Sequence, residues 1–121
     1  MQPSELQRRR DAYVDAFNRG ALEELEELLH PQASYRWVAA GKSEEGRARV
    51  MALYRYGLQA FQGQSRLSAV TGSEDQAVWW EPTPEGLQPR GLQQIRLADG
   101  LIVEIADEHE ATKVAEAARR R

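Results

Sequence analysis

The chain has 121 residues, of which 41% are hydrophobic and 29% charged, values ordinary for one soluble globular domain. We therefore interpret residues 1–121 as a single domain that is large enough to bury one core. The net charge of −3 argues against a nucleic-acid surface, and no apolar run is long enough to span a membrane, so we expect neither partner.

The sequence has no cysteine, which excludes disulfides and thiolate metal sites and is compatible with a reducing cytosol. The two histidines lie far apart in the sequence, so a zinc site would need mostly carboxylate ligands. The first ten residues are polar and carry no apolar export signal. We therefore expect a cytoplasmic protein that uses no metal and no other cofactor.

Two helices are predicted at the N-terminal end. Ser4 followed by Gln7 is typical of a capping box, and apolar residues at helical spacing continue to Gly20, a natural end. A second helix, with leucines on one face and glutamates on the other, follows directly. It ends at His30, because Pro31 disfavours helix in the residue before it.

One strand and a third helix follow. Residues 33–38 alternate in polarity and contain aromatic residues, which predicts a strand. After a loop at residues 41–42, Ser43 is the predicted N-cap of a helix that runs to about residue 61. Its predicted inner face consists of Val50, Met51, Tyr54, Leu58 and Phe61.

The C-terminal half changes from helical period to strand period. The Asp99-Gly100 pair is a strong indication of a tight hairpin, and residues 82–89, with three prolines, are predicted to be a loop. A helix is predicted from residue 108 to residue 121. Four strands are expected in antiparallel order at residues 66–71, 77–81, 92–97 and 101–105.

This order of elements predicts an α+β fold. Three amphipathic helices must bury their apolar stripes, and the sheet is the partner available to them. A strongly twisted sheet with helices on one face leaves a wedge between the two layers. We therefore expect aromatic side chains from both layers to line a largely apolar pocket.

Four short motifs occur in an order and spacing that resemble one known family. They are residues 13–20 (YVDAFNRG), residues 22–31 (LEELEELLHP), residues 46–50 (GRARV) and residues 99–104 (DGLIVE). The chain resembles SnoaL-like proteins of the nuclear transport factor 2-like superfamily. The resemblance implies a cone-shaped domain in which a curved antiparallel sheet packs against three N-terminal helices, with a short C-terminal helix.

The match has two departures and does not transfer a reaction. Ala21 and Gln32 stand where family members often have aspartate, and both of those aspartates are mainly structural. The superfamily includes polyketide cyclases, isomerases, dehydratases and epoxide hydrolases, and also proteins that only bind or dimerise. The resemblance therefore implies a fold and a pocket, not an activity.

A set of mostly aromatic side chains is expected around the pocket. The alternative is that these residues simply fill the core; many aromatics on facing elements favour a mixture of core and pocket wall. The predicted pocket residues are Tyr13, Phe17, Trp37, Met51, Tyr54, Leu58, Trp79, Gln93 and Ile95.

Trp79 and Trp80 are adjacent, so one must face the pocket and the other the outer face of the sheet. Which one is inside is left open, although the nearby Glu81 disfavours Trp79. An exposed indole usually marks an interface. We therefore predict a homodimer through the outer sheet face.

Two carboxylates are the predicted catalytic groups. A two-residue turn places Ile95 opposite Glu104, which would put Glu104 inside the wedge, where burial would raise its pKa. The resemblance implies a pocket-lining acid near Asp107. The alternatives are a surface ion pair for Glu104 and a helix N-cap for Asp107.

The remaining polar groups are weaker candidates for a role in catalysis. The hydroxyls of Tyr13 and Tyr54 could donate to a substrate carbonyl, or bond to backbone instead. His30 is expected to cap a helix and His109 to be exposed, and neither has a base partner nearby in the sequence.

Two functions are compatible with these observations. One is a small-molecule pocket protein acting without a cofactor as a cyclase, isomerase or hydrolase on an apolar or aromatic substrate. The other is a non-catalytic ligand-binding or dimerisation module. No nucleophile motif, phosphate-binding loop or metal-ligand spacing decides between them.

Overall fold

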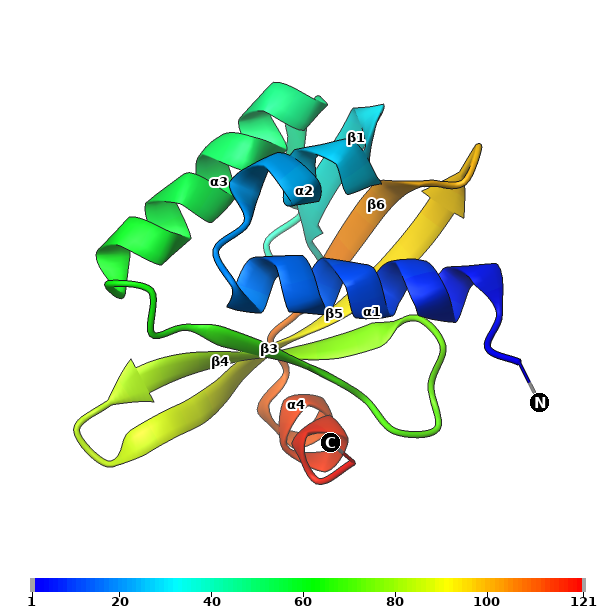
Figure 1. Cartoon of the computed structure of the whole chain (residues 1–121). Helices are drawn as coiled ribbons and strands as arrows, with labels where there is room; N and C mark the ends of the chain where they lie inside the picture. The colour runs from blue at the N-terminus through cyan, green and yellow to red at the C-terminus, as the bar shows by residue number, and fades with distance from the viewer. Residues whose placement is uncertain (1, 121) are drawn as a thin grey trace.

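The computed structural model describes residues 2–120, and its elements form layers on both faces of one curved sheet (Figure 1). Three helices cover the inner face: α1 (Glu5–Asn18), α2 (Leu22–Leu28) and α3 (Arg47–Ala60). A short helix, α4 (Ala111–Ala118), packs on the outer face. The six strands are β1 (Leu29–Trp37), β2 (Lys42–Glu45), β3 (Arg66–Ala69), β4 (Gln76–Thr83), β5 (Gly86–Ala98) and β6 (Leu101–Glu108).

The sheet has the strand order β2-β1-β6-β5-β4-β3. The expected antiparallel arrangement holds for four of the pairings between described residues, whereas β1 and β6 are parallel. The parallel pair arises because the long crossover through α3 and the later strands brings the last strand back beside the first. This pairing sets Trp37 opposite Asp107 and therefore positions the site described below.

The helix ends follow the sequence rules at α1 but not at α3. The Ser4 side chain accepts a hydrogen bond from the Gln7 N–H at 3.1 Å, which confirms the predicted cap. The prediction that Ser43 caps the third helix is wrong. Residues 42–45 pair with β1 as β2 instead, and α3 starts after Gly46, whose φ of 96° gives the sharp change of direction.

The prediction of a loop at residues 82–89 is also wrong, because β4 and β5 form a long hairpin there. Thr83 pairs with Gly86 across a two-residue turn. Trp80 pairs with Pro89, and Trp79 with Gly91, so Arg90 is the extra residue of a bulge. A bulge tolerates a neighbouring proline that lacks an N–H, and the hairpin therefore accommodates residues that normally interrupt strands.

The β5–β6 hairpin confirms the predicted tight turn and adds a bulge. Asp99 and Gly100 have φ values of 54° and 75°, as a type I′ turn requires. Leu97 pairs with Ile102, but the next pair is Arg96 with Glu104. Val103 is therefore an unpaired extra residue, and the alternation of side chains shifts by one position beyond it.

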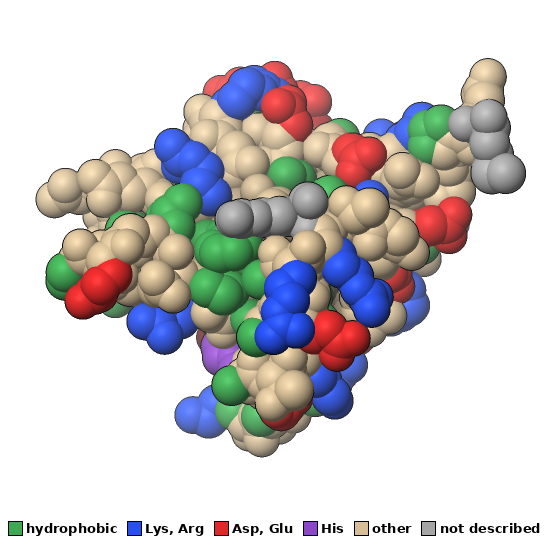
Figure 2. Space-filling view, turned by 90° about the horizontal axis from the view of Figure 1, so that it is seen from below, with side chains coloured by type: hydrophobic (Ala, Val, Ile, Leu, Met, Phe, Trp, Pro, Cys, Tyr) green, Lys and Arg blue, Asp and Glu red, His purple; other side chains and the backbone are tan. Residues whose placement is uncertain are grey.

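The apolar residues form two separate clusters. The larger lies between the sheet and α1, α2 and α3 and includes the fully buried Tyr13, Phe17 and Met51. The smaller lies under α4 and includes Trp80. Viewed from the side of α4, hydrophobic side chains gather in the middle of this face with Lys and Arg side chains around them (Figure 2).

The outward tryptophan is Trp80, and it is only 8% exposed because α4 covers it. The prediction of an exposed indole is therefore wrong, and the homodimer prediction loses the observation on which it was based.

The N-cap of α4 is Glu110, which accepts hydrogen bonds from the N–H groups of Thr112 and Lys113. The alternative role of Asp107 as this cap is thereby excluded. The last residue of the predicted helix, Arg121, lies outside the described residues.

No helix within residues 2–120 combines the length and the apolar character that crossing a membrane requires.

Candidate functional site

An aromatic pocket of about 210 Å³ opens between α3 and the inner face of the sheet. Strands β1, β4 and β6 each contribute side chains to its walls, and α3 closes the opposite side. The polar groups lie at its inner end and at its rim. The residues that line it are Tyr35, Trp37, Leu53, Tyr54, Tyr56, Gly57, Phe61, Trp79, Glu81, Arg90, Asp107 and His109.

The predicted pocket residues divide into lining, network and core positions. Trp37, Tyr54 and Trp79 line the pocket, and the inner tryptophan of the adjacent pair is thus Trp79. The others belong to the surrounding structure: Gln93 is fully buried behind the pocket wall, and the rest pack in or against the larger core. These core residues are Tyr13, Phe17, Met51, Leu58 and Ile95.

A chain of hydrogen bonds runs through the buried end of the site. Tyr13 Oη donates to Gln93 Oε1 at 2.6 Å, so Tyr54 must be the donor in the 2.7 Å bond between the two tyrosine hydroxyls. Gln93 Nε2 donates to Tyr35 Oη at 3.0 Å, and Tyr35 donates to Asp107 Oδ2. Every donor in this chain points toward the Asp107 carboxylate.

This direction has a chemical consequence for the tyrosines. Each hydroxyl has one proton, and the protons of Tyr13, Tyr35 and Tyr54 are all used within the chain. Burial raises the pKa of all three hydroxyls, so they stay protonated at neutral pH. The expected donation from Tyr13 or Tyr54 to a substrate carbonyl is therefore not supported.

Asp107 is the carboxylate at the buried end of the pocket, whereas Glu81 lies at the rim, and Asp107 is 6% exposed. Burial raises its pKa above the ordinary value of 3.8, because the charged form loses hydration. The hydrogen bond from Tyr35 and the positive charge of His109 act in the opposite direction. A carboxyl group with a raised pKa is closer to the range in which it can both take and return a proton.

His109 lies beside Asp107, contrary to the expectation that it has no partner. Its Nε2 is 3.0 Å from Asp107 Oδ1, and its side chain is 54% exposed. Asp107 Oδ1 has no hydrogen-bond partner within residues 2–120, so the His109 contact is defined by its distance alone. The contact is an ion pair when the imidazole carries a proton on both nitrogens and is therefore charged.

Gly91 makes room for this pair. A Cβ at position 91 would lie 2.6 Å from Asp107 Oδ1 and 3.4 Å from His109 Nε2. The backbone of Gly91 has an ordinary φ, so it is this close approach, not strain, that requires glycine.

We expect Gly91→Ala to displace both side chains and to lower the free energy of unfolding by about 1–3 kcal/mol, the usual range for overpacking. Urea unfolding measures the stability, and the NMR signals of the His109 ring report the displacement. A Gly91→Ala protein with wild-type stability and unchanged His109 signals would contradict the contact.

The rim of the pocket carries charges of both signs. Trp79 Nε1 donates to Glu81 Oε1 at 3.1 Å, which holds the indole across the opening. Arg90 Nε lies 3.9 Å from Glu81 Oε2, and the Arg90 side chain is 54% exposed. Tyr56 is 72% exposed at the same edge. The rim can therefore offer guanidinium N–H donors to a ligand that extends out of the pocket.

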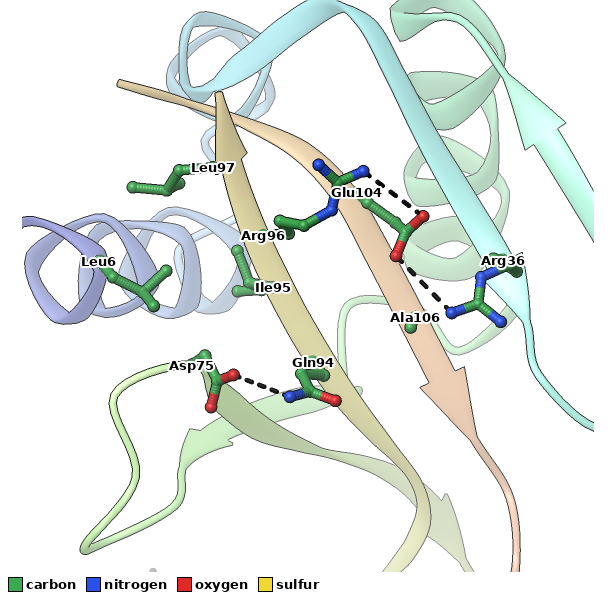
Figure 3. Close-up of a pocket in the computed structure, with 9 residues that line it drawn as sticks. All are labelled: Leu6, Arg36, Asp75, Gln94, Ile95, Arg96, Leu97, Glu104 and Ala106. Atoms are coloured by element: carbon green, nitrogen blue, oxygen red, sulfur yellow. Dashed lines mark hydrogen bonds and ion pairs between the residues drawn. The ribbon is translucent and has the colours of Figure 1, made fainter. Parts of the chain in front are cut away.

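Glu104 is on the opposite face of the sheet, so its predicted interior placement is wrong. The bulge at Val103 turns it outward, and its two carboxylate oxygens lie 3.6 Å from Arg36 and 3.8 Å from Arg96 (Figure 3). These residues belong to a shallow hollow of about 540 Å³ that also includes Leu6 of α1. Glu104 thus has the alternative placement, a surface ion pair with arginine.

Several site residues were missed by sequence reasoning. Tyr35 could have been found, because it lies two positions before Trp37 on the same face of an alternating strand. Glu81 and Arg90 sit beside the wrongly predicted loop. His109 was missed because the predicted helix began at residue 108, whereas β6 continues to that residue.

No group of three or more His, Asp or Glu side chains in the described residues 2–120 is arranged to hold a metal ion.

The structure is an α+β domain in which helices pack on a curved sheet, with a partly open pocket between α3 and the sheet. Residues 11–105 match the model of the SnoaL-like domain, and the chain belongs to that family. No curated protein sequence matches the chain significantly.

Solved structures show the same fold. A candidate ketosteroid isomerase from Kribbella flavida has a TM-score of 0.68 and 18% identity, over 88% of this chain and 78% of that one. A protein of unknown function with a cystatin-like fold from Xanthomonas campestris has 0.68 and 16%, over 96% and 98%. A candidate polyketide cyclase from Sinorhizobium meliloti has 0.60 and 16%, over 80% and 90%. At these identities the likeness concerns the fold alone.

Proposed function

We propose that this protein is an enzyme of the isomerase or cyclase type that moves a proton on a small cyclic carbonyl compound, with Asp107 as the general base. The proposal depends mainly on one observation: a buried carboxylate, oriented by Tyr35, stands at the inner end of an aromatic pocket. The names of two structural neighbours, a ketosteroid isomerase and a polyketide cyclase, agree with this class of reaction.

The size of the pocket limits the substrate. A volume of about 210 Å³ equals the liquid volume of roughly seven water molecules. Pockets that enclose drug-sized ligands usually begin at about 300 Å³. We therefore propose a single-ring substrate rather than the four fused rings of a steroid, with its ring between Trp37, Trp79 and Tyr54.

The proposed chemistry needs one base and one site for negative charge. Asp107 takes a proton from the carbon next to the carbonyl group and returns it at another carbon, so that the carboxylate is regenerated. The enolate oxygen that forms is stabilised by N–H donors. Arg90 supplies these donors, since its 3.9 Å pairing with Glu81 leaves guanidinium N–H groups free.

The test uses cyclohex-3-en-1-one, cyclohexanone and acetophenone in D₂O. We expect the protein to accelerate loss of the NMR signals of the protons next to the carbonyl group, because the proton that Asp107 takes up exchanges with D₂O before one is returned to carbon. Asp99→Asn is the matched control, since Asp99 is 87% exposed in the hairpin turn. Acceleration that survives Asp107→Asn unchanged would exclude Asp107 as the base.

The alternative function is a non-catalytic ligand-binding module. This alternative is supported if the ring compounds quench the fluorescence of Trp37 and Trp79 on binding but none exchanges its protons.

A homodimer through the outer sheet face also stays a prediction. It would have to use the hollow around Glu104 that α4 leaves uncovered, and sedimentation of wild-type protein and Arg96→Glu measures it.

A further inference from the structure

Within residues 2–120, His109 is the titratable side chain that contacts Asp107 Oδ1 and also reaches bulk solvent. Oδ2 accepts the hydrogen bond from Tyr35, and Oδ1 has His109 Nε2 at 3.0 Å as its polar neighbour. Asp107 is 6% exposed, whereas the His109 side chain is 54% exposed. The imidazole therefore spans the distance between a buried acid and solvent.

We propose that His109 carries protons between the Asp107 carboxyl group and water, which makes it the proton conduit of the site. The proposal rests on the proposed function, because a conduit matters only if Asp107 gains and loses protons. It assigns to His109 a role through Asp107, and to Gly91 the role of keeping the two side chains in contact.

The step balances in protons and needs no other reactant. A protonated Asp107 gives its Oδ1 proton to the unprotonated Nε2 of His109, which leaves a carboxylate and an imidazolium. The imidazolium then releases its Nδ1 proton to water. The reverse sequence delivers a proton from water to Asp107, and histidine suits both directions because one ring nitrogen can accept a proton while the other donates one.

The other groups that face Asp107 do not provide this route. Tyr35 of β1 and Tyr54 of α3 hold their protons, because burial raises the pKa of both hydroxyls. Arg90 of β5 offers only N–H donors and has no acceptor for the Asp107 proton. Glu81 of β4 is engaged by the Trp79 indole, and the neighbouring Glu108 interacts with Asp107 only through its charge.

The experiment needs no substrate. The Tyr35 hydroxyl proton rests on the same carboxylate, so its rate of exchange with water reports how fast protons reach Asp107. NMR saturation transfer measures this rate, and Tyr35→Phe identifies the resonance by its loss. His109→Ala is expected to fold, because the side chain is half exposed.

We expect His109→Ala to slow the exchange at least tenfold, and added imidazole to restore it by occupying the vacated space. If the resonance is visible in His109→Ala but is broadened beyond detection by fast exchange in the wild type, that outcome also shows slower exchange in the variant. His30→Ala, at the chain's other histidine, should leave the rate unchanged. Gly91→Ala should slow the exchange with both side chains present, because it separates them.

Exchange in His109→Ala within twofold of wild type, or slowed equally in His30→Ala, overturns the conduit. The same holds if the hydroxyl resonance is absent from both wild type and His109→Ala. Failure of the conduit is distinguishable from failure of the proposed function. The former appears in the protein alone, whereas the latter appears as an absence of both deuterium exchange in the ring compounds and conversion of cyclohex-3-en-1-one into the conjugated enone.

Discussion

Replacing Asp107 by Asn is expected to lower the rate of catalysed deuterium exchange about 100-fold or more, while making the folded protein more stable. General acid–base catalysis by one positioned group contributes about 10²–10⁴ in rate, and asparagine cannot accept the substrate proton. Its side-chain oxygen still accepts the hydrogen bond from Tyr35, so the site keeps its shape. The exchange assay with cyclohex-3-en-1-one measures the loss.

The stability gain follows from the raised pKa of Asp107. A carboxyl group whose pKa is higher in the folded than in the unfolded state binds more protons when folded, so its contribution to stability is complete below about pH 4. That contribution declines as the pH rises to the folded-state pKa. We therefore expect equal stability of wild type and Asp107→Asn below pH 4, and an advantage of about 1 kcal/mol for the variant near neutral pH.

Thermal unfolding at a series of pH values checks this second part, and Asp99→Asn is again the control because that carboxylate is exposed. A variant that is less stable than wild type at every pH would mean that the ionised carboxylate stabilises the fold. In that case the charge-assisted hydrogen bond from Tyr35 would outweigh the cost of burial.

Replacing Gln93 by Leu should lower the free energy of unfolding by about 2–4 kcal/mol. Gln93 is fully buried and joins Tyr13 to Tyr35, so leucine leaves two buried hydroxyls without this partner. Tyr13 keeps its bond to Tyr54 and Tyr35 keeps its bond to Asp107, so each lost hydrogen bond costs about 1–2 kcal/mol. Loss of the donor to Tyr35 also weakens the orientation of Asp107, so the exchange rate should fall in parallel.

Gln94→Leu provides the matched control. Gln94 is the next residue on the same strand, faces the opposite side of the sheet and bonds to Asp75 at the surface (Figure 3). Surface substitutions of this kind usually change stability by no more than about 0.5 kcal/mol. Urea unfolding of both variants gives the comparison. Equal effects at the two positions would mean that the buried chain of hydrogen bonds does not stabilise the protein.

Much of the architecture could be predicted from local patterns. The helix cap at Ser4 and the Asp99-Gly100 turn each depend on the residues within the motif itself, and both occur as expected. Counting back from that turn placed Gln93 and Ile95 on the inner face, where the structure has them. These predictions succeeded because they depend on residues close together in the sequence.

The failures come from interactions that span the sheet. No residue near Ser43 indicates that residues 42–45 pair with β1 instead of belonging to the helix. The cover that α4 provides for Trp80 is likewise a long-range contact. The position of His109 beside Asp107 required knowing that β6 extends to residue 108, and no periodic pattern marks that end.

The single unpaired residue in β6 determines which acid the cavity contains. Counted from the hairpin, strict alternation after Ile102 would turn Glu104 and Ala106 inward and Asp107 outward. The bulge at Val103 reverses that phase four residues before Asp107. Regular pairing that included Val103 would exchange the two carboxylates, turning the Asp107–His109 pair to solvent and removing Glu104 from its arginine partners. Deleting Val103 should instead leave Glu104 opposite Arg96 and Asp107 opposite Gln93, so that each carboxylate keeps its face. In this strand, the pairing register decides which acid faces the pocket as much as residue identity does.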